Sequence, residues 1–363
     1  VRRPWLPCVP YLIILRNMVL TFRYRIKNPK GLSAAARSVN LVWNYCGDVQ
    51  NQARRWSRRW PSGFDLAKLV AGSTRLLGLH SDTIQDVCKH FARSRDARRW
   101  RPRWRASQGK RRALGWVPFQ SARAIQLDDG SVTYLGHRYR LWQHRPIGGR
   151  VLSGSFAEDA CGKWYLNLQC EVPDRIDCGS GAVALDLGLL SLATTSDGEV
   201  IENPRHLAQH ALALAKAQRA GRKARTRAIH AKIKNARRHW LHLVSTGLVD
   251  QYRTIVVGNI SSAQLARTRM AKSVLDAGWS QFRGFLRYKA MGRGGDYAEM
   301  SERFSTQTCS ACNARGGPKG LEGLGVREWR CVCGTVHDRD VNAALNILSR
   351  WSTSVRLTES PAL

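Results

Sequence analysis

The sequence predicts a mixed, multidomain α/β and β protein, in which a β-barrel-like module with a helical insertion precedes an α/β domain. Short alternating segments over residues 18–26 and 115–175, separated by turn residues, are typical of antiparallel strands. Residues 32–96 instead have apolar residues at helical spacing. Two close cysteine pairs near the C-terminus, bracketed by acidic residues, indicate a metal ribbon inserted into the second domain.

The chain is strongly basic. Its 363 residues include 59 Lys and Arg against 26 Asp and Glu, a formal net charge of +33, which favours a polyanionic partner. We expect no membrane partner, because no apolar run approaches the ~20 residues that cross a bilayer. A reducing compartment suits the unpaired cysteines, so we expect a cytoplasmic protein. Residues 1–17 are expected to be an upstream extension.

Arginines alternate with tryptophans over residues 54–60 and 98–105. Cations neutralise phosphates and indoles stack on bases, so these stretches predict a nucleic-acid surface, although any single tryptophan is expected in the core. A third stretch, 216–238, has ten Lys or Arg and no acid, and a helix of this charge needs phosphate beside it. The predicted nucleic-acid contacts are Arg54, Arg55, Arg58, Arg59, Arg98, Arg99, Arg101, Arg103, Arg105, Lys110, Arg111, Arg112, Arg222, Lys223, Arg225, Arg227, Arg237 and Arg238.

The two cysteine pairs are separated by a Gly-rich spacer. Four thiols in this pattern predict one tetrahedral Zn²⁺. The second pair, Cys-x-Cys, is one residue tighter than the usual knuckle, so His337 is a possible substitute for one thiol and an empty ribbon is the alternative. The predicted zinc ligands are Cys309, Cys312, Cys331 and Cys333.

Asp186 lies inside the apolar, β-rich run 181–195. A carboxylate buried alone is costly, so this one needs a hydrogen-bonding partner or a cation. It could cap a turn before Gly188, but we favour a metal ligand on the first strand of an RNase H-like fold. Asp338 and Asp340 precede an amphipathic helix, and either could be its N-cap.

Several of these segments together resemble the TnpB family, RNA-guided nucleases of bacterial insertion sequences that are related to Fanzor proteins and type V CRISPR effectors. The resemblance covers nearly the whole chain from Met18 to about Ser349, with weaker matches in the N-terminal half. The matching segments are residues 184–189 with 197–204, 270–279, 305–312, 337–344, 79–84 and 115–119.

The resemblance implies the domain organisation. It assigns 18–31 and 111–175 to a wedge β-barrel, 32–110 to a helical recognition insertion, 176–304 and 336–350 to a RuvC-like nuclease domain, 305–335 to the zinc ribbon and 351–363 to a flexible tail. It also implies a guide RNA that pairs with double-stranded target DNA, and a monomeric protein within a ribonucleoprotein.

The resemblance further implies cleavage of DNA with two Mg²⁺ held by about three carboxylates. Asp186 and Asp340 match two of them, which leaves Asp338 as local structure. The family usually has the second ligand, a glutamate, where this chain has Gly258, but some relatives carry it on the next strand. Glu302 suits that position, whereas Glu299 would face the other side of a strand and is the second choice.

The missing glutamate at Gly258 leaves a second function open, a nuclease-inactive RNA-guided DNA-binding repressor. A third interpretation is an accessory transposase. It ranks last as a mechanism because the sequence has no tyrosine motif of the relaxase kind.

Overall fold

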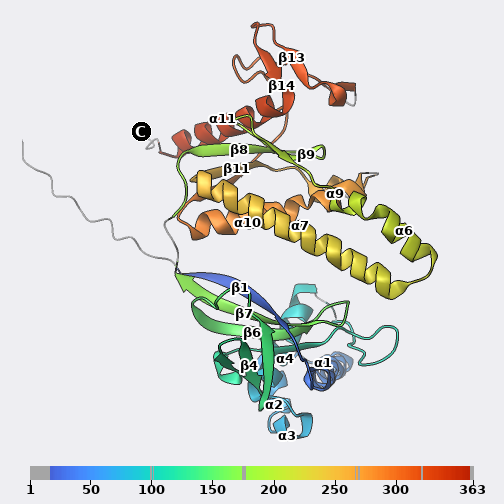
Figure 1. Cartoon of the computed structure of the whole chain (residues 1–363). Coiled ribbons are helices and arrows are strands. Elements are labelled where there is room, and N and C mark those ends of the chain that lie inside the picture. The colour runs from blue at the N-terminus through green and yellow to red at the C-terminus, as the bar shows by residue number, and fades with distance from the viewer. Residues whose placement is uncertain are drawn as a thin grey trace, which may run out of the picture. The chain divides into compact units, whose positions relative to one another are not determined.

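The computed structural model describes residues 17–98, 100, 102–173, 177–265, 267–268, 270–319 and 322–359. It divides into two compact units, Val1–Pro173 and Asp174–Leu363, and each is described by itself (Figure 1). The extension expected at 1–17 falls outside the described residues except for Asn17, which begins the first strand.

The first unit contains a seven-stranded antiparallel sheet in the order β2-β6-β7-β1-β5-β4-β3. Side chains alternate along each strand, and on β1 Phe22, Tyr24 and Ile26 are buried while the residues between them face outward. The sheet therefore has one packed and one outward face. Its strands are β1 (Asn17–Ile26), β2 (Trp116–Phe119), β3 (Gln126–Asp128), β4 (Ser131–Tyr134), β5 (His137–Trp142), β6 (Arg150–Glu158) and β7 (Trp164–Pro173).

The predicted helical insertion lies between β1 and β2. It consists of α1 (Leu32–Arg55), α2 (Gly63–Leu69), α3 (Thr74–Leu77) and α4 (Ser81–Arg98), and a short 3₁₀ helix, Ala122–Ala124, follows β2. Trp43 of α1 packs edge-on against Phe91 of α4 and Trp116 of β2, with ring centroids 5.3 and 6.2 Å apart. These aromatic contacts join the helices to the core of the sheet.

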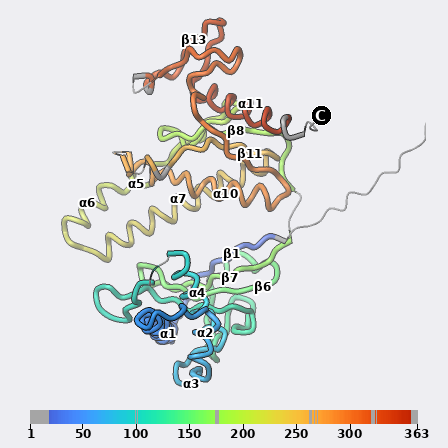
Figure 2. The backbone as a smooth tube through the Cα atoms, turned by 180° about the vertical axis from the view of Figure 1, so that it is seen from behind, coloured from blue at the N-terminus to red at the C-terminus, as the bar shows by residue number. Residues whose placement is uncertain are grey.

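The second unit has a five-stranded sheet in the order β10-β9-β8-β11-β12. Strand β11 is parallel to both β8 and β12, whereas β9 and β10 are antiparallel. Helices cover both faces (Figures 1 and 2), which explains the nearly continuous apolar runs of β8 and β11. The strands are β8 (Ala182–Leu187), β9 (Ser191–Thr195), β10 (Val200–Glu202), β11 (Thr254–Gly258) and β12 (Asp296–Met300).

Helices α7 and α10 pack on one face of this sheet and α11 on the other. Trp279, Phe282 and Leu286 form the buried stripe of α10 that their spacing predicts. No described helix has the length and apolar character needed to cross a membrane. The helices are α5 (His206–Gln209), α6 (Ala211–Arg219), α7 (Lys223–Gln251), α8 (Ser262–Leu265), α9 (Ala271–Ala277), α10 (Trp279–Gly292) and α11 (Arg339–Glu359).

The cysteine pairs lie in an insertion between β12 and α11. It contains a 3₁₀ turn, Glu322–Gly325, and a small antiparallel ladder of β13 (Glu328–Arg330) with β14 (Val336–Asp338). Strand β14 leads directly into α11, so the insertion is joined to the helix that covers the sheet.

Candidate functional site

Asp186 stands near the end of β8, on the face that α11 covers. Two residues earlier on the same strand, Ala184 packs with Ile347 of α11, and side chains two apart share a face. Leu185 pairs with Val257 of the parallel strand β11. Continuing this register by one residue places Gly258 beside Asp186.

The carboxyl group of Glu302 fills the space that a side chain at Gly258 would need. A Cβ atom built on Gly258 would lie 1.9 Å from Oε1 of Glu302, far inside van der Waals contact. Oε1 is buried and has no hydrogen-bond partner in the described part of the chain. The glycine at the end of β11 is therefore what admits the glutamate that arrives from beyond β12.

The pKa values show that negative charge gathers here without full compensation. Burial raises the pKa of Asp186 well above its usual range, and the charges of Glu302 and Asp340 raise it further. Burial also raises the pKa of Glu302, to about 7, although a backbone hydrogen bond from Ile260 and the charge of Arg283 oppose the shift. Closely placed carboxylates with raised pKa values are suited to a cation.

Asp340 is the second residue of α11, and the preceding Asp338 caps the helix. Oδ1 of Asp338 accepts the backbone N–H groups of Asp340 at 2.9 Å and Val341 at 2.8 Å, as expected for local structure. Asp340 is left for other partners, and its Oδ2 lies 2.8 Å from Nη1 of Arg327 in the cysteine insertion.

The acidic group is open rather than tightly closed. Within the described ranges, only the four cysteines form a group of three or more potential ligands whose atoms all lie within 4.8 Å of one another. The charges of Glu302 and Asp340 act on Asp186, but the three carboxylates are spread more widely than that.

Glu299 lies on the opposite face of the sheet. Its carboxylate contacts Arg283 at 3.4 Å and Arg287 at 2.6 Å, both on α10, and accepts the hydroxyl of Tyr297 at 2.9 Å. The structure thus brings Glu302, and not Glu299, to Asp186.

The four cysteine thiols gather at one point. The Sγ atoms of Cys309 and Cys333 are 3.8 Å apart, and those of Cys312 and Cys331 are 3.6 Å apart. A tetrahedron with Zn–S bonds of about 2.3 Å has edges of about 3.8 Å, so the cluster could bind zinc despite its short Cys-x-Cys.

His337 lies directly beside this cluster of four thiols. Its Nε2 lies 3.0 Å from Sγ of Cys309, and its buried ring packs on Trp329 with centroids 4.8 Å apart. Hydrogen bonds of this kind orient metal ligands.

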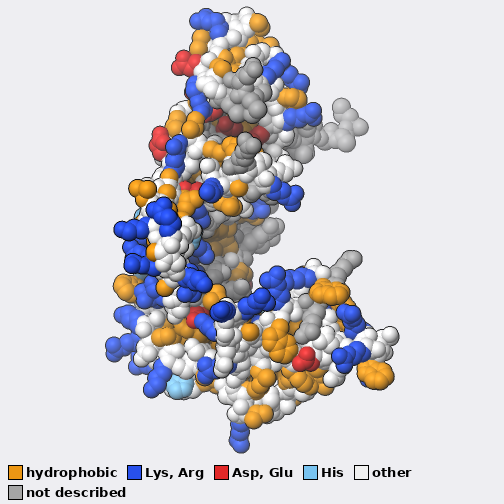
Figure 3. All heavy atoms as spheres, turned by 90° about the vertical axis from the view of Figure 1, so that its right-hand side faces the viewer, with side chains coloured by type: hydrophobic (Ala, Val, Ile, Leu, Met, Phe, Trp, Pro, Cys, Tyr) orange, Lys and Arg blue, Asp and Glu red, His pale blue; other side chains and the backbone are white. Residues whose placement is uncertain are grey.

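Most predicted nucleic-acid contacts are exposed. Figure 3 shows Lys and Arg side chains over much of the visible face, with few carboxylates among them. Arg99 and Arg101 lie outside the described residues, and Arg237 and Arg238 are half-buried, with Arg237 paired to Asp276 at 3.4 Å. The exposed ones are Arg54, Arg55, Arg58, Arg59, Arg98, Arg103, Lys110, Arg111, Arg222, Lys223, Arg225 and Arg227.

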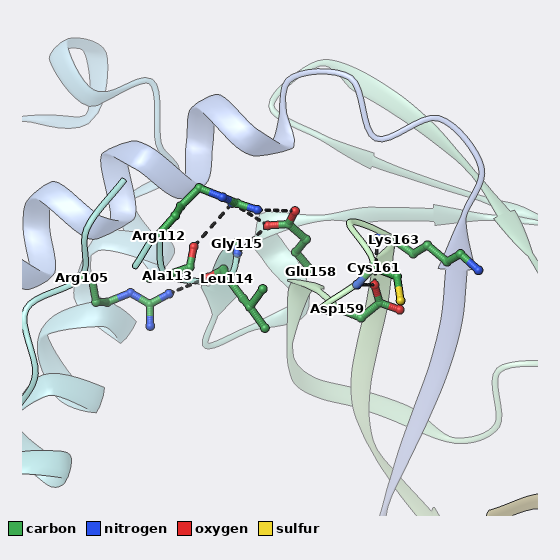
Figure 4. Close-up of polar contacts among 9 residues, drawn as sticks. All are labelled: Arg105, Arg112, Ala113, Leu114, Gly115, Glu158, Asp159, Cys161 and Lys163. Carbon is green, nitrogen blue, oxygen red and sulfur yellow. Dashed lines mark hydrogen bonds and ion pairs between the residues drawn. The ribbon is translucent and has the colours of Figure 1, made fainter. Parts of the chain in front are cut away.

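Two of the predicted contacts, Arg105 and Arg112, differ because their guanidinium groups bind the protein itself (Figure 4). Arg105 donates to Oδ1 of Asn40 at 2.7 Å and to the carbonyl of Leu114 at 2.9 Å, and burial lowers its pKa. Arg112 forms a two-pronged ion pair with Glu158, with both N–O distances 2.8 Å. These arginines hold residues 105–115 in place and are poorly available to phosphate.

The tryptophans of the basic stretches are more exposed than expected. Trp56, Trp100 and Trp104 expose 72%, 64% and 57% of their surface, so the expectation that a single tryptophan is in the core is wrong for them. The guanidinium of Arg54 lies 5.3 Å from the ring centre of Trp100. Rings of this kind can stack on bases.

The structure has a second basic surface, which the sequence did not predict. Arg23 and Arg25 on β1, and Lys27 directly after it, point away from the core of the seven-stranded sheet, and Arg138 and Arg140 do so on β5. Trp142, 59% exposed, pairs with Arg25 across the two strands. Cations at alternate positions of strands form no run in the sequence, and only their period of two could have revealed them.

The chain matches two protein families over the segments that form these sites. Residues 167–269 match the family described as probable transposase, and residues 279–347 match the Cas12f1-like TNB domain. A Streptomyces pristinaespiralis protein named "Putative RNA-guided DNA endonuclease" is 37% identical over 221 residues, 56% of this chain and 54% of that protein. Over these segments the chain is similar to the TnpB family.

Other comparisons agree with this similarity. The Escherichia coli K12 protein named "Putative RNA-guided DNA endonuclease InsQ" is 27% identical over 330 residues, 81% of this chain and 78% of that protein. Cas12f1, solved in complex with sgRNA and target DNA, has a TM-score of 0.56 at 13% identity, covering 87% of this chain and 81% of its own. The chain therefore has a Cas12f-like fold. It aligns with about half the length of the Streptomyces relative.

Proposed function

We propose that this TnpB-family protein is an RNA-guided DNA endonuclease encoded by a transposable element, with Asp186, Glu302 and Asp340 as ligands of catalytic Mg²⁺. The observation that carries the proposal is the buried Glu302 carboxyl, which lies in the space left by Gly258, beside Asp186, with one oxygen unpartnered. The names of the relatives support the same activity.

The chain's own residues supply different parts of the site. Asp186 stands on a strand buried between two helical layers, so its backbone is rigidly held. Glu302 must lose its proton to hold a cation, and with a pKa of about 7 it is partly protonated near neutral pH before metal binds. Asp340 must exchange part of its contact with Arg327. When bound, magnesium would activate water and stabilise the leaving oxygen of the phosphodiester.

The proposed partners are a guide RNA and double-stranded DNA. Both are polyanions, and the exposed cations of the helical insertion, of α7 and of the outward face of the seven-stranded sheet can neutralise their phosphates. Base pairing with the guide would then select the sequence, so the protein needs mainly backbone contacts.

The test is cleavage of target DNA by the full chain with the RNA that copurifies with it. We expect magnesium-dependent cleavage that Glu302→Gln abolishes. The matched Glu299→Gln variant loses only contacts to Arg283, Arg287 and Tyr297 and should still cleave. Cleavage that vanishes with Glu299→Gln and persists with Glu302→Gln would show that Glu299, and not Glu302, is the metal ligand.

A nuclease-inactive, RNA-guided DNA-binding protein is the second candidate. The open spacing of the carboxylates and the ion pair between Asp340 and Arg327 favour it. Its signature is guided DNA binding without cleavage across a wide range of magnesium or manganese concentrations, and that result would replace the first proposal.

A further inference from the structure

Helix α11 carries three polar side chains at four-residue intervals, Asn342, Asn346 and Arg350, which share one face of the helix. All three donate hydrogen bonds to backbone carbonyls between Ser301 and Thr308. This segment follows β12 and contains Glu302. The proposed magnesium site uses only Asp340 of α11. The site as proposed therefore does not explain these contacts.

The two asparagines are buried, with 1% and 5% of their surface exposed. Nδ2 of Asn342 donates to the carbonyls of Ser305 at 3.2 Å and Thr308 at 2.8 Å, and Nδ2 of Asn346 donates to the same two carbonyls at 2.8 and 2.7 Å. Oδ1 of Asn342 accepts the N–H of Ser310 at 2.9 Å. Buried amides need partners, and these contacts all join α11 to the backbone of one segment.

The segment needs such support because it is irregular. Residues 303–307 form a turn without ladder hydrogen bonds, and Phe304 has a left-handed backbone with φ 62°. Arg350 binds the carbonyl of Ser301, immediately before Glu302, and Ser305 donates its N–H to the carbonyl of Glu302 at 3.0 Å. Glu302 is thus held from both sides, which compensates for its place on a turn rather than a strand.

The same asparagines also reach the cysteine cluster. Thr308 and Ser310, which they bind, are the two neighbours of Cys309 in the chain. One face of α11 therefore contacts the backbone beside a proposed magnesium ligand and the backbone beside a candidate zinc ligand. The helix itself carries Asp340, two residues before Asn342.

We propose that Asn342 and Asn346 are positioning residues that couple the cysteine cluster to the magnesium site. This inference rests on the proposed role of Glu302. The two amides hold the segment from Glu302 to Cys309 against α11 and so fix the carboxylate of Glu302 relative to Asp340. Arg350 adds the contact on the other side of Glu302.

The first experiment measures Mn²⁺ binding to the full chain by electron paramagnetic resonance, without nucleic acid. We expect Asn346→Ala to weaken Mn²⁺ binding about tenfold, the usual effect of losing a group that orients a metal ligand. In a Glu302→Gln background the same substitution should have no further effect, because the residue acts through Glu302. Ser349→Ala, at an exposed position of the same helix, is the matched control and should bind Mn²⁺ normally.

The second experiment follows transfer of zinc from the protein to a coloured chelator. Asn346→Ala should release zinc several-fold faster than the wild type, with the zinc content of the purified protein unchanged, whereas Ser349→Ala should not differ. Zinc release at the wild-type rate would overturn the coupling to Cys309.

Two outcomes separate this inference from the proposed function. If Glu302→Gln abolishes Mn²⁺ binding and Asn346→Ala leaves it unchanged, the positioning role is wrong and the nuclease site stands. If Glu302→Gln has no effect, the ligand assignment and the positioning role fail together. An equal loss from Asn346→Ala in both backgrounds would show a general structural effect and overturn the inference.

Discussion

The two sheets of this protein place charge in opposite ways. The seven-stranded sheet is covered by core on one face and presents Arg25, Arg138 and Arg140 on the other. The five-stranded sheet is covered on both faces, and Asp186 lies under the helical layer at the end of β8. The exposed cations keep their solvation, whereas the buried carboxylates lose it and have raised pKa values.

This difference indicates which ligand suits each sheet. A solvated cation gains by replacing small counterions around a polyanion, which is a surface effect that depends on salt. A desolvated carboxylate gains most from a small multivalent cation, which is a local effect that depends on geometry and pH. The predictions below test whether the two sheets divide binding and cleavage in this way.

The largest expected effect is on cleavage by Asp186→Ala. Removing the carboxylate on β8 should lower the rate of guided DNA cleavage by at least about 10³-fold, as for other groups that act as a unit at a reacting centre. RNA and DNA binding should change by less than about twofold, because the substitution removes no cation that could contact phosphate. Cleavage rates and gel-shift affinities measured on the same preparations check both statements. A parallel loss of binding would break the division of roles.

Gly258→Ala should follow in size. The new Cβ would displace the Glu302 carboxyl, which can move because it is the end of a flexible side chain, so the fold should remain intact. We expect the magnesium concentration for half-maximal cleavage to rise about tenfold or more. Gly284→Ala on α10 is the control, since no atom lies within 4 Å of its Cβ. An unchanged magnesium requirement would show that Glu302 is not a ligand where it stands.

The sheet arginines should affect RNA binding alone. The double variant Arg25→Ala, Arg140→Ala should weaken RNA binding and reduce the slope of log affinity against log salt by about 0.7 per lost phosphate contact. Arg112→Ala should keep the slope, since that guanidinium is committed to Glu158. Filter binding at several salt concentrations provides the measurement. Equal slopes in wild type and double variant would exclude the outward face as an RNA surface.

The smallest effect concerns stability. The pKa of Glu302 is about 7 in the folded state against an ordinary 4.5, so ionisation opposes folding. The stability that protonation provides is complete below about pH 4.5 and is lost as pH rises through about 7. In magnesium-free buffer, Glu302→Gln should therefore unfold nearly like wild type at pH 4.5 but be about 3 kcal/mol more stable at pH 8. Urea unfolding at both pH values checks this; a difference that does not grow with pH would contradict it.

Much of the acidic site could be predicted from the sequence because it follows from alternation. Asp186 interrupts an apolar strand, and a spacing of three residues predicts opposite sides for Glu299 and Glu302. Their contacts do lie on opposite sides of the sheet, although Glu302 stands beyond the end of β12. The position of Glu302 beside Gly258 could not be predicted, because it depends on the turn after β12. The short Cys-x-Cys spacing likewise did not predict the Sγ–Sγ distances in the cluster of four thiols.

Charge runs were a weaker guide. Arg105 and Arg112 read as part of a basic stretch, but their partners, Asn40 and Glu158, are distant in sequence and come close only in the folded unit. Arg23 and Arg140 showed no run at all. A sequence shows how many cations a segment has, but only the fold shows which of them already bind other groups of the protein.

The residues at positions 258 and 302 restrict one another, because a side chain at position 258 would occupy the volume beside Asp186 that the Glu302 carboxyl fills. Moving the glutamate back to the end of β11 would first crowd two carboxylates into that volume, or else leave it with none. Each single substitution on the way from one arrangement to the other therefore gives a less fit variant. A redesign of the site should exchange both residues in one step.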